Sequence, residues 1–475
     1  MILATSTALA DPWLSPGDEA LRHDIQLLSD AGIIRGPVTT WPLSWPDLAR
    51  DVLNRPMDGG LGEAVLSALI RVQRQARRSS ALGYSGIGLK ASGAHEPVEL
   101  RGFADMPREE GEVAARASWL TNHFAVNLQG AVVADPDNGK KVRADGSYVG
   151  LNVGNFMVSA GYMERWWGPG WDGSLILSTN SRPIPSLTIE RNYTDPFRTP
   201  LLSWLGPWRA SIAVGQAEGS DVAVADVRFL AARVNFRPRP WLEVGLTRTA
   251  QWCGEGRICD FETFANLLIG RDNRDESLPF GEEPGNQMAG YDLRLRSPYA
   301  RLPVAVYTQW IGEDEAGGLP SKFLGQAGVE TWGAWGRASW RVHAEFTDTT
   351  CTFTREQPDF DCAYRNAHFP QGYTHRGRVI GHSMDNDSRA YSLGALFMRD
   401  NGDSLSLLFR HVELNRDGGQ HSISTLPREV DNVELRLSGA RRFGKIGLGL
   451  GYGDPRRDSA DDSGMHAFVT WQQGF

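Results

Sequence analysis

Several features are missing from this sequence of 475 residues. It contains no run of 18 or more apolar residues, so hydropathy predicts no transmembrane helix. A basic excess is also missing, because 49 Lys and Arg stand against 57 Asp and Glu. This argues against a dedicated nucleic-acid-binding protein. Glycine (53) and tryptophan (16) are plentiful, while mean hydropathy is only −0.35. Many short strands with aromatic girdles and a polar lumen would combine these features, as in a transmembrane β-barrel.

The first residues resemble an export signal. Residues 1–10 form a short apolar stretch that ends in Ala8-Leu9-Ala10, the small-x-small pattern cut by signal peptidase. We interpret residues 1–10 as a signal-peptide remnant. The alternative is an apolar N-terminal tail.

Cysteine is scarce, with four residues: Cys253, Cys259, Cys351 and Cys362. Three connectivities are possible, and the sequence alone does not choose among them. Neither close pair has C-x-x-C spacing, which argues against zinc. We predict the local disulfides Cys253–Cys259 and Cys351–Cys362, each closing a short loop in an oxidising compartment.

A helical period runs through residues 11–80. Ser15-Pro16-Gly17-Asp18 and Ser44-Trp45-Pro46-Asp47 are start signals for two helices. A third stretch carries an apolar stripe made by Leu61, Val65, Leu69 and Val72. We expect three short amphipathic helices, which form a small bundle or pack on something larger. They cannot satisfy a lipid environment, so we place 11–80 in the periplasm, where a tag near Gly59 should resist external protease.

From residue 81 to residue 475 the period is two. Apolar and polar residues alternate in Leu120–Gln129, Trp208–Gly215, 432–438 and 446–453. One apolar face and one polar or glycine face suit a strand between lipid and a wet lumen. The chain also ends in Phe475 after an alternating stretch, which resembles the sorting signal of outer-membrane barrels, although Gln473 departs from that pattern. The expected fold is mainly β, a large antiparallel transmembrane barrel with extracellular loops and a small N-terminal helical bundle.

Motifs for catalysis or cofactors are weak. The Gly447–Gly453 run lies inside an alternating strand and is no dinucleotide loop. Asp385-Asn386-Asp387-Ser388 hints at calcium, but Ala390 and Leu396 occupy positions that exclude an EF-hand. Carboxylates near aromatics, such as Glu164 or Glu282-Glu283, are expected by chance among 57 acids. We therefore predict no enzyme activity, no cofactor and no metal.

One segment is unusually rich in tryptophan. It runs from Glu164 to Pro185, and its candidate polysaccharide-binding residues are Arg165, Trp166, Trp167, Trp171 and Arg182. Indole faces stack on sugar rings, and guanidinium groups pair with acidic sugars. The competing interpretation is an aromatic girdle or a turn packed inside the lumen.

At this segment the sequence resembles the Wzi family of capsule-assembly proteins. The resemblance spans nearly the whole chain and rests on several motifs in order: DPWLSPGDEALRHDIQLLSDAGII, TTWPLSWPDL, RWWGPGWDGSLILSTNSRPIPSLTI, the GEGR and GRDN elements of Trp252–Asp272, NQMAGYDLRLRSP, IGEDEAGGLPSK and GYTHRGRVIGHSMDNDS. The resemblance implies an 18-stranded outer-membrane barrel with a small periplasmic helical bundle. It also implies a lectin-like role, in which the protein holds capsular polysaccharide or related exopolysaccharide at the cell surface.

The leading hypothesis is thus a non-enzymatic, monomeric, polysaccharide-binding barrel in outer-membrane lipid, without nucleic-acid partners. Its alternatives are an outer-membrane channel and, further behind, a surface glycosidase. Lumen occlusion discriminates between the first two, because a lectin barrel should be plugged by inward loops whereas a porin should conduct ions.

Overall fold

The computed structural model describes residues 9–56, 60–136, 139–217, 224–268, 285–299, 301–316, 319–366, 369–453 and 464–475. Some features predicted from the sequence lie outside these ranges. They are residues 1–8 of the signal-peptide remnant, Gly59, the GRDN element and Glu282-Glu283.

The predicted barrel is confirmed. In the described ranges an antiparallel sheet of 18 strands closes on itself through β25 (Met465–Gly474) and β4 (Gly83–His95). Closure leaves the sheet without an open edge. The other wall strands are β5 (Gly111–Leu120), β6 (Phe124–Ala134), β7 (Val142–Arg143), β8 (Tyr148–Val153), β9 (Phe156–Gly161), β11 (Ser186–Arg191), β12 (Trp208–Ala217), β13 (Val227–Arg239), β14 (Leu242–Trp252), β15 (Gly285–Arg296), β16 (Val304–Ala316), β17 (Leu319–Trp335), β18 (Ala338–Asp348), β21 (Arg389–Met398), β22 (Ser404–Leu414), β23 (Arg428–Arg441) and β24 (Gly444–Tyr452). β7 and β8 both pair with β6 and together make one interrupted wall strand.

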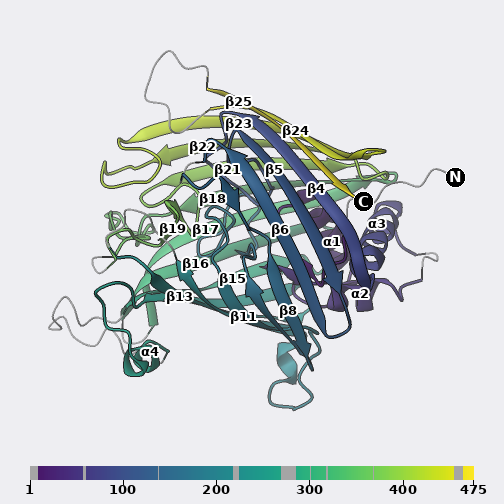
Figure 1. Cartoon of the computed structure of the whole chain (residues 1–475), viewed down its shortest axis with the longest axis horizontal. Coiled ribbons are helices and arrows are strands. Elements are labelled where there is room, and N and C mark those ends of the chain that lie inside the picture. The colour runs from purple at the N-terminus through teal and green to yellow at the C-terminus, as the bar shows by residue number, and fades with distance from the viewer. Residues whose placement is uncertain are drawn as a thin grey trace.

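The two ends of the barrel differ. Three N-terminal helices and the C-terminus lie at one end, which we call the helix end, on the right in Figure 1. Helix α4 and long connections lie at the opposite end, which we call the loop end. Because the strands run between these ends, every position along a wall strand has a defined height in the lumen.

Apolar side chains of the wall point outward. On β12, Ile212 is 52% exposed while its neighbour Ser211 is 4% exposed. On β23, Leu435 is 40% exposed while Glu434 is 2% exposed. The alternation predicted at these strands is confirmed. An apolar exterior around a polar interior is what a wall in contact with lipid requires.

Aromatic side chains mark the turns at the helix end. Exposed rings belong to Trp204 in the 3₁₀ turn η1 (Ser203–Leu205), Tyr299, Trp335 and Phe443. Tryptophan and tyrosine rings, which have one polar edge, collect where lipid meets water, so Trp204, Tyr299 and Trp335 indicate the membrane boundary at this end.

One predicted strand is wrong. The alternating stretch Leu120–Gln129 is a hairpin, because β5 ends at Leu120 and β6 begins at Phe124. In the turn, the Thr121 hydroxyl accepts hydrogen bonds from the amides of His123 (3.2 Å) and Phe124 (2.9 Å). A threonine that satisfies turn amides in this way can end a strand without glycine or proline. The sequence pattern alone therefore missed the turn.

The helices are α1 (Glu19–Asp30), α2 (Trp45–Val52), α3 (Glu63–Ser79) and, at the loop end, α4 (Phe261–Leu268). None of the helices in the described ranges is long and apolar enough to cross a membrane.

The helix starts are partly as predicted. Ser44 is the N-cap of α2 and accepts an amide hydrogen bond from three residues ahead (3.3 Å). For α1 the predicted start at Ser15 is wrong, because Asp18 is the N-cap and accepts from the amide of Leu21 (3.0 Å). Gly17 has a φ of +113°, a conformation that no helix contains, so the helix cannot begin before it.

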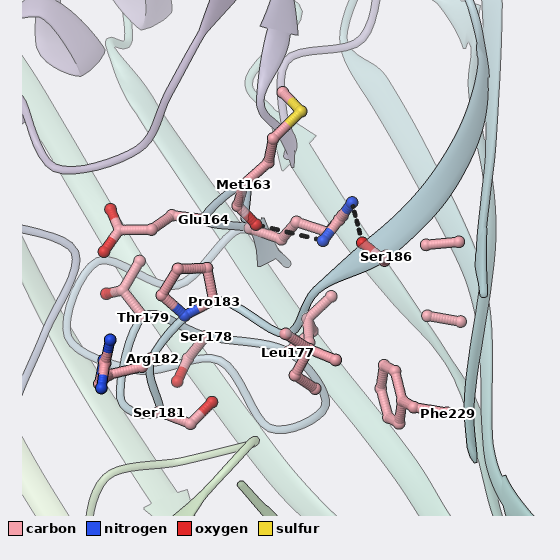
Figure 2. Close-up of a pocket in the computed structure, with 14 residues that line it drawn as sticks. Met163, Glu164, Leu177, Ser178, Thr179, Ser181, Arg182, Pro183, Ser186 and Phe229 are labelled. Carbon is pink, nitrogen blue, oxygen red and sulfur yellow. Dashed lines mark hydrogen bonds between the residues drawn. The ribbon is translucent and has the colours of Figure 1, made fainter. Parts of the chain in front are cut away.

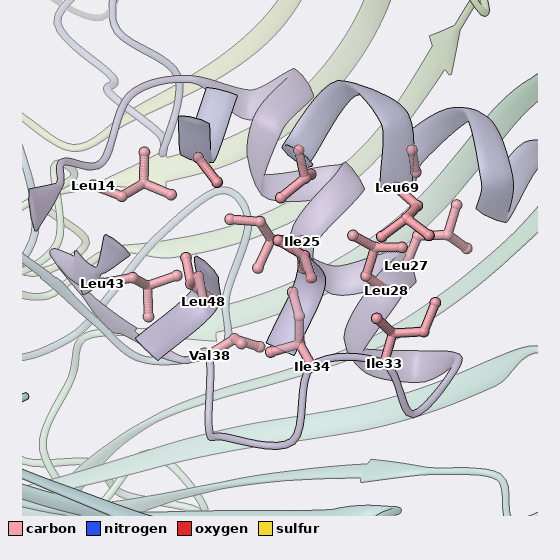
Figure 3. Packing of buried hydrophobic residues seen from close by; sticks show 14 of the residues in the cluster. Leu14, Ile25, Leu27, Leu28, Ile33, Ile34, Val38, Leu43, Leu48 and Leu69 are labelled. Atoms are coloured by element: carbon pink, nitrogen blue, oxygen red, sulfur yellow. The ribbon is translucent and has the colours of Figure 1, made fainter. Parts of the chain in front are cut away.

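The three N-terminal helices pack against the barrel wall. Their buried core, shown in Figure 3, includes Leu28, Val52 and Val72 together with Ala305 of β16 and Trp332 of β17. The helices are thus joined to the wall by a shared apolar core.

Candidate functional site

The tryptophan-rich segment fills part of the lumen. We call residues 162–185 the lumenal segment: it leaves the wall after β9 and returns at β11, where Gly161 and Ser186 face each other in register. Nearly all of its residues from 163 to 184 are buried. Its two ends are therefore neighbours in the wall, and everything between them projects inward.

The first two tryptophans join the segment to the helices. β10 (Trp166–Trp167) pairs with β2 (Thr40–Trp41), and both indoles are fully buried. Trp166 lies edge-on to Phe103 at 5.4 Å and belongs to the core of the helices. Trp167 packs in a second core with Leu175. These two rings hold the lumenal segment between two apolar clusters.

The third tryptophan is bound to the wall. The Trp171 indole N–H donates to Glu330 of β17 (2.9 Å), and its ring stacks on His343 of β18 at 5.6 Å. The Arg22 guanidinium of α1 lies 4.2 Å from the same ring and donates to the Gly170 carbonyl (2.9 Å). Gly170 is required here because a Cβ would come within 2.3 Å of a backbone oxygen in the same turn.

Both candidate arginines are occupied. Arg165 donates to the hydroxyls of Ser186 (3.0 Å) and Thr188 (2.5 Å), and burial lowers the pKa of its guanidinium to about 10. Arg182 forms a two-pronged ion pair with Asp145 (2.7 and 2.8 Å). Paired guanidinium groups of this kind fix the geometry of a segment.

The segment is also tied to the wall by charge. The Asp172 carboxylate accepts from Arg410 of β22 (2.8 Å). Burial acts to raise the pKa of Asp172, but the charge and the hydrogen bond of Arg410, together with nearby histidines, lower it below its usual range. Burial lowers the pKa of the nearby His382 imidazole to about 4, so that this ring is neutral at physiological pH.

The cavity beside the segment is small. Figure 2 shows it between Glu164, Arg182, Ser186 and Phe229. The dashed lines are hydrogen bonds donated by the Arg165 guanidinium, one of them to Ser186. Its volume is about 20 Å³. That is room for about one water molecule, which excludes a sugar ring.

All five candidate residues are therefore buried. Arg165, Trp166, Trp167, Trp171 and Arg182 are each no more than 9% exposed. A polymer outside the barrel cannot contact them directly. Their other predicted role, shaping a neighbouring loop, has structural support, described next.

The lumenal segment supports an outer loop. Tyr364 donates to the Leu175 carbonyl (2.6 Å), and Tyr373 donates to the Ile176 carbonyl (2.8 Å). Both tyrosines belong to the long connection between β18 and β21, which also contains the short hairpin β19 (Thr374–His375) and β20 (Arg378–Val379). The lumenal segment thus holds the β18–β21 connection in place through these two hydrogen bonds.

Two disulfides close loops at this end. Cys253–Cys259 and Cys351–Cys362 are formed as predicted, with Cα–Cα distances of 4.8 and 5.9 Å. Each constrains a connection that leaves the wall at the loop end.

The accessible apolar side chains of these loops were not predicted from the sequence. The outer loop surface, as we define it, comprises the exposed apolar side chains at the loop end: Ile258, Phe261, Phe360 and Leu426. The Arg416 guanidinium lies 5.7 Å from the Phe360 ring. Phe360 lies in the 351–362 disulfide loop among polar and charged residues, and this isolation inside a closed loop was the available signal.

No metal centre is evident in the described part of the chain, where no group of three or more His, Cys, Asp or Glu side chains could hold an ion. In the 385–388 run, burial raises the pKa of the Asp387 carboxyl to about 7.

The chain matches a known protein family. The family described as capsule assembly protein Wzi matches residues 85–453. A protein of Klebsiella pneumoniae, described as an uncharacterized 55.8 kDa protein in the cps region, is 32% identical over 339 residues. The match covers 70% of this chain and 65% of that relative, so the chain spans somewhat less than two thirds of its length.

Among solved structures, one barrel is similar throughout. It is described as Wzi, an outer membrane protein involved in group 1 capsule assembly in Escherichia coli and a carbohydrate-binding β-barrel. The TM-score is 0.84 at 24% identity, with 97% of this chain and 99% of that chain covered. OccK5 of Pseudomonas aeruginosa has a TM-score of 0.43 at 8% identity, over 83% of this chain and 98% of that chain, which is too low to support an inference.

Proposed function

Because the chain belongs to the family of capsule assembly protein Wzi, we propose that it is an outer-membrane protein that binds capsular polysaccharide or related exopolysaccharide and holds it at the cell surface. It acts by binding and not by catalysis. The family match covers most of the chain, and the lipid-compatible wall supports the membrane location.

The observation that carries the proposal is the occluded lumen. A barrel of this size leaves an aqueous channel if nothing fills it. Here the lumenal segment crosses the interior and is bonded to opposite parts of the wall, through Asp145, Glu330 and Arg410. This arrangement favours a surface-binding protein over the channel.

Polymer contacts belong on the outer loop surface. Phe360 supplies an apolar face for a sugar ring, and the Arg416 guanidinium beside it, paired with Glu413 (3.2 Å) and Asp348 (3.4 Å), supports that face. Each such contact is weak, but a polymer presents many copies of its repeat, and linked contacts multiply affinity without any single strong site. A monomer is sufficient for this mode of binding.

The decisive experiment is capsule retention in a strain that lacks the protein. We expect total polymer to be unchanged and cell-associated polymer to fall, with the missing fraction shed into the medium. Unchanged retention, or a fall in total synthesis, would contradict the proposal. Release of reducing ends from purified capsule would instead identify the glycosidase.

The topology makes a further prediction. A protease-sensitive tag after Gly60, at the helix end, should stay intact when whole cells are treated with external protease, because we place this end in the periplasm. The same tag after Thr425, in an exposed loop at the loop end, should be cut. Cleavage at Gly60 in intact cells would invert the topology.

The buried tryptophans give a prediction about support of the outer loop. Replacing Trp167 and Trp171 with Phe retains most of the apolar volume, but it removes the hydrogen bond from Trp171 to Glu330. Combined with Arg182→Lys, which breaks the two-pronged pair with Asp145, this should loosen the supported loop and shed capsule from cells with normal barrel levels.

Loss of cell-associated polymer should be severalfold, measured against a matched Trp335→Phe variant, whose ring is exposed at the helix end. If the triple variant accumulates normally, resists heat in gels like the parent and retains full capsule, the lumenal segment has no part in binding.

A further inference from the structure

A second, larger cavity lies inside the barrel. It measures about 390 Å³, within the range of small-molecule binding sites. Its lining starts at the helix end with Ser404, Ser438 and Lys445, which lie within a few residues of the β21–β22 and β23–β24 turns. It continues along the inner faces of β25, β4, β5 and β6 as far as Asp145. This cavity is separate from the small one beside Arg165.

The loop-end limit of this cavity is closed by ion pairs and hydrogen bonds. Asp145 is held by Arg182 of the lumenal segment (2.7 Å). Arg108 donates to the Asn180 carbonyl (2.6 Å) and so joins another lining residue to the same segment. A molecule in the cavity therefore stops below the lumenal segment.

Most charges that line the cavity are neutralised by a neighbour. Lys90 pairs with Asp105 (2.9 Å), and Lys445 pairs with Asp18 (2.6 Å). Arg436 pairs with Glu19 (3.2 Å). These pairs position the wall of the cavity and leave little net charge for a ligand.

Arg116 is different. It lies on β5 directly opposite Gln129 of β6, and both side chains line the cavity. Within the described ranges, neither the Arg116 guanidinium nor the Gln129 amide makes a hydrogen bond or an ion pair through its side chain. Asp11 lies close enough for its charge to interact with Arg116, but it accepts hydrogen bonds from Tyr148 and Trp13 instead.

The rest of the lining suits a hydroxyl-rich molecule. Thr470 and Gln472 of β25 offer a hydroxyl and an amide, and Phe468 on the same face offers a ring. Hydroxyl and amide groups exchange hydrogen bonds with sugar hydroxyls, and an aromatic ring packs against the apolar face of a sugar. A cation with unused donors adds recognition of a carboxylate.

We propose that this cavity is an internal binding site for a short acidic saccharide, entered from the helix end, with Arg116 binding the sugar carboxylate and Gln129 a neighbouring hydroxyl. The ligand class rests on the proposed function, whereas the position of the site rests on the cavity itself. Because the helix end is placed in the periplasm, the site would hold an acidic saccharide that reaches it from the periplasm, separately from the polymer at the outer loop surface.

The test uses the full-length purified protein and a single introduced thiol. The chain has no free cysteine in its described part, and its four cysteines form the two disulfides. Gln129→Cys therefore places one reactive thiol beside Arg116. Thr425→Cys, exposed in an outer loop, is the matched control. The rate of labelling by a small maleimide is measured with and without trigalacturonate, and with maltotriose as the neutral comparison.

We expect Gln129→Cys to react and trigalacturonate to slow its labelling about tenfold at saturation, with no effect on Thr425→Cys. Maltotriose should protect only at much higher concentration. Adding Arg116→Gln should raise the trigalacturonate concentration for half-protection roughly tenfold or more, the usual effect of losing a hydrogen bond to a charged group. Arg116→Lys, which retains the charge, should recover part of the loss.

Three results would overturn the site: a thiol at 129 that never reacts, equal protection by the acidic and neutral trisaccharides, or half-protection that Arg116→Gln leaves unchanged. The comparison of the two trisaccharides needs only Gln129→Cys, so it decides the matter even if Arg116→Gln fails to fold. Capsule retention by the strain lacking the protein tests the proposed function separately. If the strain lacking the protein sheds polymer as expected but the protection assay fails, only the internal site is refuted.

Discussion

A barrel stripped of its interior should conduct ions, whereas the parent should not. The variant replaces residues 164–184 with a four-residue Gly-Ser linker and also begins the mature chain at Ser80. The linker is long enough because Gly161 and Ser186 are paired neighbours in the wall, so a tight turn can join the two strands. Removing both the lumenal segment and the helices leaves the closed 18-stranded wall around a wider lumen, in which the buried 97–110 connection remains.

In planar bilayers we expect no conductance steps for the parent and clear steps for the double deletion, since a barrel of this size holds a water-filled channel where its interior is not filled. Deleting the helices alone should leave the barrel closed, because the lumenal segment is anchored independently to Arg410 and Gln309. If the parent protein conducts ions to the same extent as the double deletion, the channel function is favoured instead.

The second large effect concerns the contact between α1 and the wall. Asp30 at the end of α1 accepts two hydrogen bonds from Arg294 of β15 (2.8 and 3.1 Å) and lies 3.4 Å from Arg341 of β18. Glu330 of β17 pairs with both arginines, and all four side chains are buried. The group is electrically balanced, with two positive and two negative charges.

Asp30→Ala leaves one buried positive charge uncompensated, which typically costs about 3–5 kcal/mol. We expect the helices to detach from the wall while the barrel stays closed, so limited trypsin digestion should cleave within residues 11–80 much faster than in the parent. The control is Asp195→Ala, which removes a solvent-exposed pair with Arg50 of α2 and should cost less than about 1 kcal/mol. Equal digestion of the two variants would mean that the buried ion group does not hold the helices.

The wall was predictable because its strands obey one rule. Outward positions meet lipid and inward positions meet polar groups, so alternation at β12, β23 and β24 identifies both the strand and its faces. The disulfides were predictable because each links two cysteines that lie close in sequence. The hairpin at 120–129 was missed because Thr121 makes a turn without the residues that normally announce one.

The interior could not be predicted by the same rule. A cluster of tryptophans indicates a binding platform only if the rings reach solvent, and here a polar lumen buries them by supplying partners such as Glu330 for Trp171. Arg116 and Gln129 looked like ordinary inward-facing residues of alternating strands. They face each other across β5 and β6, and the cavity that they line exists only once the wall has closed.

That closure also sets a condition on biogenesis. The seam that completes the cylinder joins β4, near the start of the wall, to β25, the last strand of the chain. Until β25 is made, every shorter chain carries two unsatisfied strand edges, which are templates for pairing with other chains. Late truncations should therefore be far more damaging than their length suggests, because losing the final ten residues leaves the whole cylinder unsealed.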